Sequence, residues 1–247
     1  WSRRHATLHE VTDGRWWMMY HGYENGYWTL GRQALLDPIE WTEDGWFVAK
    51  GGDLGQPLRK PSGSDPSTVH GQALSDDFDS DRLGHQWAFF NPAPDEMQRV
   101  SFKDGALVLQ GKGNAPRDAS PLTVIAGDQA YQFEVELEVD PGATGGVLLF
   151  YSDRLYVGVG SNGEKFVMHR YGQERPTGGL SPGKGGTLWL RVTNNQHIVT
   201  FHTSTDGRAW EKYPVQMEVS GYHHNVAGQF LALKPAIYAA GEGKVRF

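Results

Sequence analysis

The chain has 247 residues and carries 23 Lys and Arg against 29 Asp and Glu, which gives a formal net charge of -6. This acidic balance argues against a nucleic-acid-binding protein, because phosphate groups are neutralised by clustered basic side chains. No segment approaches the roughly 20 consecutive apolar residues of a membrane-spanning helix, so no membrane partner is expected. The absence of cysteine excludes disulfides and thiolate metal sites.

Both ends of the sequence resemble internal segments of a longer chain. The first residue is Trp1 rather than Met, and the last residue, Phe247, continues the alternating segment Lys244–Arg246. We therefore expect further chain on the N-terminal side. The compartment is left open, because this composition fits a secreted, a periplasmic or a cytoplasmic protein.

The composition predicts an all-β protein. The 32 Gly, 13 Pro and 12% aromatic residues are typical of many short strands joined by tight turns. Helical periodicity is absent almost everywhere. We expect three parts: residues 1–49, a Gly- and Pro-rich linker over residues 50–72, and a second β-unit over residues 73–247.

The first part combines a β-hairpin with a high density of tryptophan. Asp13-Gly14 is a hairpin signal between strands expected at residues 5–11 and 16–21, and more β-structure is expected over residues 27–36. Six of the nine tryptophans are here: Trp1, Trp16, Trp17, Trp28, Trp41 and Trp46. So few strands cannot bury that much aromatic surface among themselves. We expect another part of the protein, either an N-terminal segment or residues 73–247, to cover it.

The second part predicts two sheets packed face to face, with a closed barrel as the alternative. Residues 132–139 alternate between apolar and polar side chains, which indicates one buried and one solvated face. The expected strands are Arg99–Phe102, Ala106–Gln110, Leu122–Ile125, Tyr131–Val139, Val147–Tyr151, Leu155–Val159, Lys165–Arg170, Thr187–Val192, Ile198–Thr203, Gly228–Leu233 and Val245–Phe247.

Two series of motifs give the sequence a family resemblance. The first series consists of Arg4–Leu8, Gly14–Gly22, Leu30–Leu36, Pro38, Glu40-Trp41 and Asp44–Trp46. Together these motifs resemble the last blade of the five-bladed β-propeller in glycoside hydrolase family 43, the β-xylosidase and α-L-arabinofuranosidase family. The second series consists of Asp76–Phe78, Gln86-Trp87, Ser220–Asn225, Lys234-Pro235 and Gly243–Phe247. It resembles the concanavalin-like β-sandwich that follows the propeller in many of those enzymes.

The resemblance implies an inverting, exo-acting glycoside hydrolase that releases xylose or arabinose from plant cell-wall polysaccharide. In such enzymes one carboxylate activates water and a carboxylic acid, roughly 6.5–9.5 Å away, protonates the leaving oxygen. No Asp or Glu in residues 1–49 matches the family's catalytic motifs, so no catalytic residue is assigned. The implied partners are a xylo- or arabino-oligosaccharide and a preceding propeller segment, without which this chain is expected to be inactive.

Five residues are expected to bind substrate. Arg32 matches the family arginine that reaches the sugar pocket, where its fork of N–H donors suits vicinal hydroxyls or a carboxylate. His21 ends the preceding strand near the same place, and the cluster Tyr222, His223 and His224 lies in a polar segment of the sandwich that can close one side of the pocket. The alternatives are structural: ion pairing or packing between blades for Arg32 and His21, and a plain surface loop for Tyr222–His224.

Calcium is the expected cofactor, at the propeller centre or in the sandwich. His5 matches the family histidine that points toward the propeller axis and helps to hold a central metal ion, directly or through water. Because calcium prefers oxygen ligands, a hydrated shell has to supply the remaining ligands. Asp77, in the acidic segment that opens the sandwich, is the second candidate. The alternatives are a hydrogen-bonded core histidine and a solvated acidic turn.

A different class of function remains open at this stage. The sandwich alone is the right size for a non-catalytic carbohydrate-binding module or for a structural domain. An exposed line of aromatic residues spaced for sugar rings favours binding, and buried aromatic residues favour the structural role.

Overall fold

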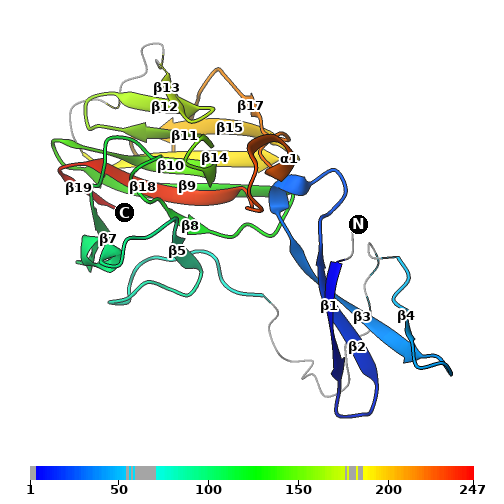
Figure 1. Cartoon of the computed structure of the whole chain (residues 1–247). Coiled ribbons are helices and arrows are strands. Elements are labelled where there is room, and N and C mark those ends of the chain that lie inside the picture. Colours follow the sequence, from blue (N-terminus) through cyan, green and yellow to red (C-terminus); the bar gives the residue numbers. More distant parts are fainter. Residues whose placement is uncertain are drawn as a thin grey trace.

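The computed structural model describes residues 4–53, 56, 58, 71–175, 177, 182 and 186–247. Figure 1 shows a small N-terminal sheet set beside a larger two-layered sandwich, with the two in contact through one end of the small sheet. The all-β prediction is confirmed, because the helical elements described are only two short 3-10 turns and one short α-helix. The boundaries at residues 49 and 72 stay predictions, since most of the expected linker lies outside the described residues.

The N-terminal sheet is an antiparallel meander. Its strands pair in chain order: β1 (Arg4–Glu10), β2 (Trp16–Gly22), β3 (Gln33–Trp41) and β4 (Phe47–Ala49). Gly14 has φ +78 in the turn between β1 and β2, so the predicted hairpin is confirmed. The strand expected from residue 27 begins later, because the 3-10 turn η1 (Trp28–Leu30) precedes it. This four-stranded meander is the form of one propeller blade.

One face of this sheet has its own small apolar cluster. Met18, Tyr20 and Ile39 are buried there, with Trp16 and Phe47 packed against them. Register pairs Met19 with Leu36 on the opposite face, which the sandwich leaves open to solvent. The apolar side chains that stay exposed on the sheet and its hairpin tip are Met19 (48%), Leu36 (41%), Trp41 (47%), Trp46 (71%) and Val48 (47%).

The tryptophans therefore divide between buried and exposed positions. Trp17 is buried, whereas Trp41 is about half exposed. Trp41, the last residue of β3, touches Trp16, the first residue of β2, edge-on at 5.3 Å between ring centroids. The sandwich does not enclose the aromatic surface of the first part.

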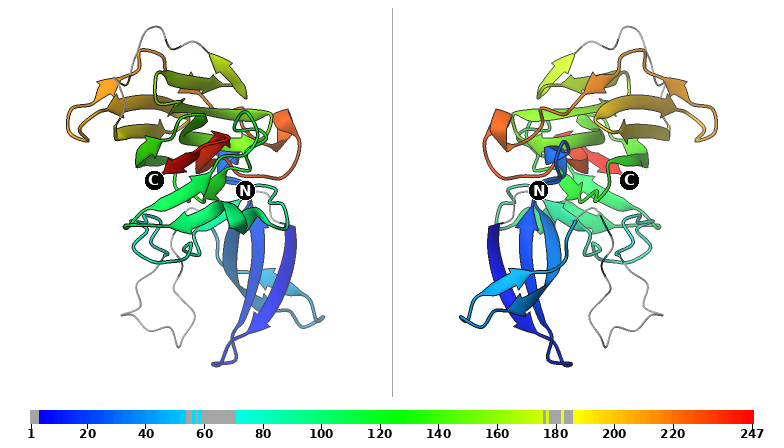
Figure 2. Two further views of the ribbon diagram at one scale, coloured as in Figure 1. Left: turned by 90° about the vertical axis from the view of Figure 1, so that its left-hand side faces the viewer. Right: turned by 90° about the vertical axis from the view of Figure 1, so that its right-hand side faces the viewer.

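The sandwich consists of two antiparallel sheets, which Figure 2 shows from two sides. The first sheet has the order β13 (Gln173–Arg175), β12 (Phe166–Arg170), β11 (Leu155–Ser161), β10 (Ala143–Ser152), β18 (Lys234–Gly241), β8 (Leu122–Val124) and β5 (Trp87–Phe89). The second has the order β16 (Glu211–Lys212), β15 (Ile198–Ser204), β14 (Leu188–Asn195), β9 (Ala130–Val139), β19 (Lys244–Arg246), β7 (Leu107–Gln110) and β6 (Val100–Phe102), and β17 (Met217–Glu218) also pairs with β15. The 3-10 turn η2 (Glu96–Arg99) precedes β6.

The main core lies between these two sheets, as the alternation in residues 132–139 predicts. Leu137 of β9, Leu190 of β14 and Val147 of β10 are at most 1% exposed, whereas Glu134 and Glu136 on the other face of β9 are exposed. Each sheet thus contributes one apolar face. The prediction of two packed sheets, rather than a barrel, is confirmed.

One predicted strand is wrong. Residues 228–233 do not form a strand; they follow the short helix α1 (His224–Ala227) as irregular chain, and β18 begins only at Lys234. Gly228 and Gln229 both have positive φ, at +67 and +59, and this left-handed backbone cannot continue a strand. The segment between α1 and β18 is consequently free to turn toward the N-terminal sheet.

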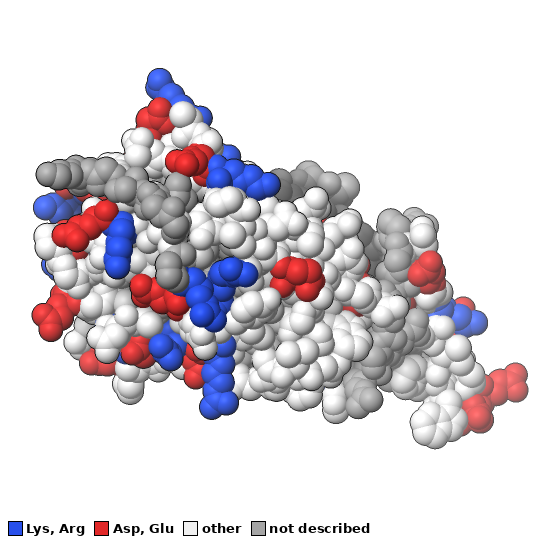
Figure 3. All heavy atoms as spheres, turned by 90° about the horizontal axis from the view of Figure 1, so that it is seen from above, with Lys and Arg blue, Asp and Glu red and all other residues white. Residues whose placement is uncertain are grey.

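The surface carries no large patch of one charge on the face shown in Figure 3, where basic and acidic side chains are interspersed around a broad uncharged area. None of the helices in the described part of the chain is long and apolar enough to cross a membrane.

Candidate functional site

The two parts of the chain meet along two irregular segments, Tyr23–Arg32 and His223–Leu233, which we call the junction. The Leu233 N–H donates to the Thr29 carbonyl oxygen at 2.7 Å. The His197 Nε2 atom lies 3.1 Å from the Thr29 hydroxyl oxygen, and the Gln129 side-chain amide donates to the Glu24 carboxylate. These bonds hold η1 against the sandwich and thereby fix Arg32, two residues after it.

Glycine is required where the two segments come closest. A Cβ atom at Gly31 would lie only 2.8 Å from the Cβ of Ala232, and Gly31 has φ +72, a left-handed conformation. The absence of a side chain lets the two backbones approach. Arg32 can therefore reach residues of the sandwich.

Arg32 lies between aromatic rings from both parts of the chain. Its guanidinium carbon is 4.1 Å from the ring centroid of Phe230 and 5.9 Å from that of Tyr23, within the range of cation–π contacts. Arg32 is exposed and forms no ion pair with any residue that the structure describes. Its N–H donors are therefore open to a ligand. Phe230 is 64% exposed beside them, so part of its aromatic ring is also accessible to a ligand.

The two adjacent histidines join the same cluster. The His224 ring lies 4.6 Å from Tyr23 and 5.2 Å from Phe230, and the Trp28 ring meets His223 edge-on at 5.1 Å. His223 begins α1, where its Nδ1 atom accepts the Asn225 N–H at 3.2 Å, so its ring orientation is fixed. Burial, together with the nearby imidazoles of His224 and His197, lowers the pKa of His223. At neutral pH it is therefore an uncharged hydrogen-bonding group.

His21 and His5 extend the cluster along the N-terminal sheet. Their ring centroids are 5.6 Å apart. The pKa of His21 is lowered by desolvation first, then by the positive charge of Arg32 and by His5, which shows that these side chains share one region. His5 has φ +54 and lies in a bulge of β1 between Arg4 and Thr7. Bulges of this kind re-aim a side chain and are frequent beside functional sites.

Tyr222 is placed differently from the other predicted substrate residues. It is 3% exposed and belongs to the main core, with its ring 6.1 Å from that of Tyr171. Its side chain packs into the core of the sandwich, whereas Arg32 is exposed. Its part in substrate binding stays a prediction that none of these contacts supports.

The described residues alone do not fit a calcium ion. No group of three or more His, Asp or Glu side chains in the described part of the chain converges with metal-site geometry. At His5 the neighbouring side chain is another imidazole, which is a poor calcium ligand. The calcium ion and the role of His5 therefore stay predictions, and we derive no step through the metal.

In the acidic segment, Asp76 rather than Asp77 is engaged. The Asp76 carboxylate accepts hydrogen bonds from the Phe78 N–H, from Gln86 and from the Trp87 indole N–H, at 2.9–3.0 Å. Both oxygens of the Asp76 carboxylate therefore already accept hydrogen bonds from protein donors. Asp77 is exposed beside it, and its role as a metal ligand likewise stays a prediction.

The junction is suited to a neutral, polyhydroxylated ligand. It offers guanidinium and imidazole hydrogen-bonding groups next to the aromatic surfaces of Phe230, Tyr23 and Trp28. These three aromatic residues were not predicted as site residues. Residues 228–233 were predicted as a strand and residues 27–36 as β-structure, so no irregular segment was expected at either place. The available signals were Gly31 and Gly228, which lie within three residues of Trp28 and Phe230 and can interrupt a strand.

Two family models match the chain, one in each of its two parts. The family model described as "Beta xylosidase C-terminal Concanavalin A-like domain" matches residues 75–246, which is more than half of the chain. The model described as "Glycosyl hydrolases family 43" matches residues 1–47.

Individual relatives agree with these two matches. A non-reducing end alpha-L-arabinofuranosidase of Bacteroides ovatus is 32% identical over 142 residues, which cover 55% of this chain and 26% of that protein. A putative beta-xylosidase of Escherichia coli is 25% identical over 253 residues, covering 87% of this chain and 46% of that protein. The crystal structure of the GH43 protein BlXynB of Bacillus licheniformis matches with a TM-score of 0.83 and 26% identity, over 99% of this chain and 52% of that one. The chain thus spans about half, or less, of the length of these relatives.

Proposed function

Because the chain belongs to glycoside hydrolase family 43, as the last part of its catalytic domain followed by the Concanavalin A-like C-terminal domain, we propose that it is the C-terminal part of an inverting, exo-acting glycoside hydrolase. The proposed substrates are xylo- or arabino-oligosaccharides from plant cell-wall polysaccharide, and the products are xylose or arabinose. The printed activities of the relatives, an arabinofuranosidase and a beta-xylosidase, support this substrate class.

The observation that carries the proposal is the junction. Arg32 of the N-terminal sheet and Phe230 of the sandwich lie 4.1 Å apart, although 198 residues separate them in sequence. Both side chains are exposed. The guanidinium can donate hydrogen bonds to the hydroxyl groups of a sugar, and the aromatic ring can pack against the C–H groups of the sugar ring. His21, His223 and His224 supply further hydrogen-bonding groups around them.

The chain's own part in the proposed reaction is to bind and orient the sugar. The water-activating carboxylate and the carboxylic acid that protonates the leaving oxygen would come from the part of the enzyme that the relatives have and this chain does not span. Arg32 would hold a hydroxyl or one of these carboxylates in place. Phe230, Trp28 and Tyr23 would limit the access of bulk water to the bound sugar.

The proposed partner for the exposed face of the N-terminal sheet is a preceding propeller blade. Met19, Leu36 and Val48 are all more than 40% exposed on that sheet. Exposed apolar side chains that gather on one face favour contact with another part of a protein. Burial against another blade would remove it from water. His5 would then face the propeller axis, where the proposed calcium ion would find its oxygen ligands.

The test is the activity of a whole protein that contains this chain and its N-terminal catalytic part. Arg32→Ala should lower kcat/KM on aryl β-D-xylopyranoside or aryl α-L-arabinofuranoside at least 100-fold, because a charged hydrogen bond to the bound sugar is lost. The control is Arg15→Ala, since Arg15 lies in the distant hairpin and pairs with Asp13. Activity toward neither substrate in the unaltered whole protein would refute the proposal, and so would an Arg32→Ala variant with unchanged kcat/KM.

A further inference from the structure

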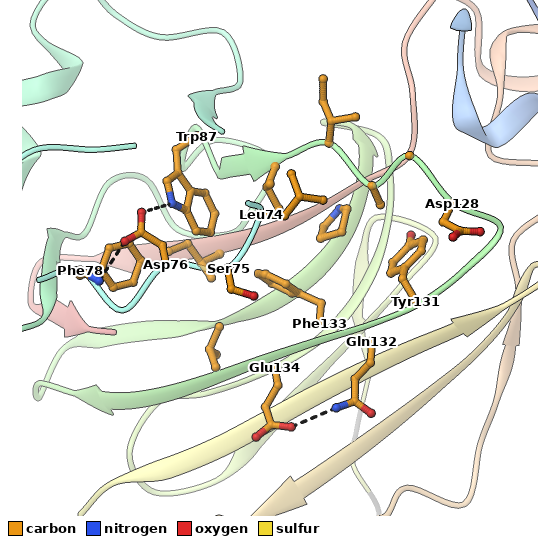
Figure 4. Close-up of a pocket in the computed structure, with 17 residues that line it drawn as sticks. Leu74, Ser75, Asp76, Phe78, Trp87, Asp128, Tyr131, Gln132, Phe133 and Glu134 are labelled. Atoms are coloured by element: carbon orange, nitrogen blue, oxygen red, sulfur yellow. Dashed lines mark hydrogen bonds between the residues drawn. The ribbon is translucent and has the colours of Figure 1, made fainter. Parts of the chain in front are cut away.

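A cavity of about 390 Å³ opens at one side of the sandwich (Figure 4). It lies where β9 of one sheet faces β5, β8 and β18 of the other. On this side β9 is paired only at Glu138 and Val139, by the short strand β19. Among the described residues, no strand pairs with this edge of β9 before Glu138. The cavity opens between the two sheets along this unpaired stretch, next to Tyr131–Val135.

The cavity has an aromatic wall that is already fixed in place. The Trp87 indole N–H donates to the Asp76 carboxylate at 3.0 Å, and the other oxygen of Asp76 accepts the Phe78 N–H at 2.9 Å. The Phe78 and Trp87 rings lie 5.9 Å apart at an angle of 30°. Figure 4 shows Phe133 and Tyr131, from β9, facing the same space from the other side. Such an ordered wall needs no rearrangement to receive a ligand.

Polar groups accompany this wall. Tyr131 is half-buried in the lining of the cavity, and burial raises the pKa of its phenol. Its hydroxyl group can exchange hydrogen bonds with a ligand in the cavity. Ser75 and Asp128 lie at the mouth of the cavity and are exposed, beside the exposed apolar side chains of Leu74 (45%) and Ile125 (61%).

We propose that this cavity is a second glycan-binding site, which holds one or two sugar rings of a xylo-oligosaccharide. Its volume is within the range of small-ligand pockets, roughly 300–1,000 Å³. Aromatic rings next to a hydroxyl, a carboxylate and open backbone edges match a ligand that has apolar C–H faces and many hydroxyl groups. The ligand class rests on the proposed function, but the site is separate from Arg32 and Phe230.

The site would also communicate with the junction. The loop from Ile125 to Tyr131 lines the cavity, and within this loop Gln129 donates to Glu24 of the N-terminal sheet. A glycan in the cavity would order this loop. The sandwich would thereby hold a polysaccharide chain close to the place where a terminal sugar is proposed to bind.

Amide mapping of this chain with xylotriose tests the proposal. In two-dimensional NMR spectra, xylotriose should shift the amide signals of Gly127, Asp128 and Tyr131 in a saturable manner. The same shifts should persist in Arg32→Ala, which alters only the junction. Tyr131→Phe removes one hydroxyl and should weaken the binding that these amides report about 5-fold or more.

A variant that fills the cavity mouth provides the complementary result. Ser75→Trp should abolish the shifts at Gly127–Tyr131, whereas Ser101→Trp, at an exposed position outside the cavity, should leave them unchanged. Shifts at Gly31 and Arg32 alone, with none at Gly127–Tyr131, would overturn this proposal and leave the proposed function intact. Shifts at Gly127–Tyr131 in a whole protein without hydrolase activity would support the cavity site and refute the proposed function. If Ser75→Trp does not fold, the mapping on the unaltered chain decides.

Discussion

At the scale of single residues, the pKa of His21 reports the position of Arg32. Desolvation lowers this pKa first, and the positive charges of Arg32 and His5 lower it further. Arg32→Gln should therefore raise the pKa of His21 toward its ordinary value, whereas Arg32→Lys should keep it lowered. An NMR titration of the imidazole signals measures this. Equal pKa values in the unaltered chain and in Arg32→Gln would show that the two side chains are not neighbours.

A second residue-scale prediction concerns acid stability. His169 is buried on the outer face of the first sheet, with its Nε2 atom 2.8 Å from the Tyr238 hydroxyl oxygen, and burial lowers its pKa to about 4. The unfolded chain binds this proton near pH 6.5, so folding stability is complete above pH 6.5 and is lost as the pH falls toward 4. The loss amounts to about 3 kcal/mol.

Denaturant unfolding at pH 7 and at pH 4 measures that loss. His169→Gln keeps a hydrogen-bonding side chain beside Tyr238 but has no group that titrates in this range. The variant should lose less stability than the unaltered chain over the same interval. If both lose the same amount, His169 does not titrate as its burial requires.

Residue-level reasoning from the sequence identified part of the junction. Arg32 was predicted from the family resemblance, His21 from its place near Arg32, and His223 and His224 from a polar segment of the sandwich. The structure brings these side chains into one cluster. Phe230 was missed, because an isolated aromatic residue in an apolar segment cannot be distinguished from a core residue by pattern alone. Only the folded chain shows that its ring is exposed beside a guanidinium.

At the scale of elements, the contact between η1 and the segment before β18 depends on Gly31. Gly31→Ala should destabilise the chain by about 1–2 kcal/mol for the left-handed backbone, and by about 1–3 kcal/mol more for the contact with Ala232. Gly26→Ala is the matched control, because Gly26 also has positive φ, at +82, but its Cβ would meet nothing within 4 Å. Thermal or denaturant unfolding of both variants gives the comparison. Equal destabilisation would mean that the two segments do not approach as described.

The elements of the fold differ in how well the sequence predicts them. Strand β9 alternates cleanly between polar and apolar residues and was predicted almost to its ends, and the Asp13-Gly14 turn fixed the β1–β2 hairpin. The irregular segments at 27–32 and 228–233 were predicted as strands. Gly31, Gly228 and Gln229 have positive φ inside these segments. The residues that the two segments contact lie in the other part of the chain, which a local pattern does not contain.

At the scale of the whole molecule, the chain consists of a small sheet that contacts a sandwich at the junction, and both parts have solvent-exposed apolar side chains. Membership in glycoside hydrolase family 43 accounts for the sheet's exposed Met19, Leu36 and Val48, which would pack against a preceding blade in the proposed enzyme. The sequence predicted that the tryptophan-rich part needs a covering partner, either an N-terminal segment or residues 73–247, because so few strands cannot bury six indoles among themselves. It could not predict which rings stay exposed, since that depends on the angle at which the sandwich docks.

The central claim is that Arg32 and Phe230, from the two parts of the chain, bind the same sugar. A double-mutant cycle in the whole protein tests it most directly, with kcat/KM measured for Arg32→Ala, Phe230→Ala and the double variant. Arg32→Ala should lose at least 100-fold and Phe230→Ala at least 10-fold. The double variant should lose clearly less than the product of the two, because the residues act on one bound ring. Ser101→Ala, at an exposed position of β6 in the sandwich, should retain full activity. Unaltered activity of Phe230→Ala would contradict the account.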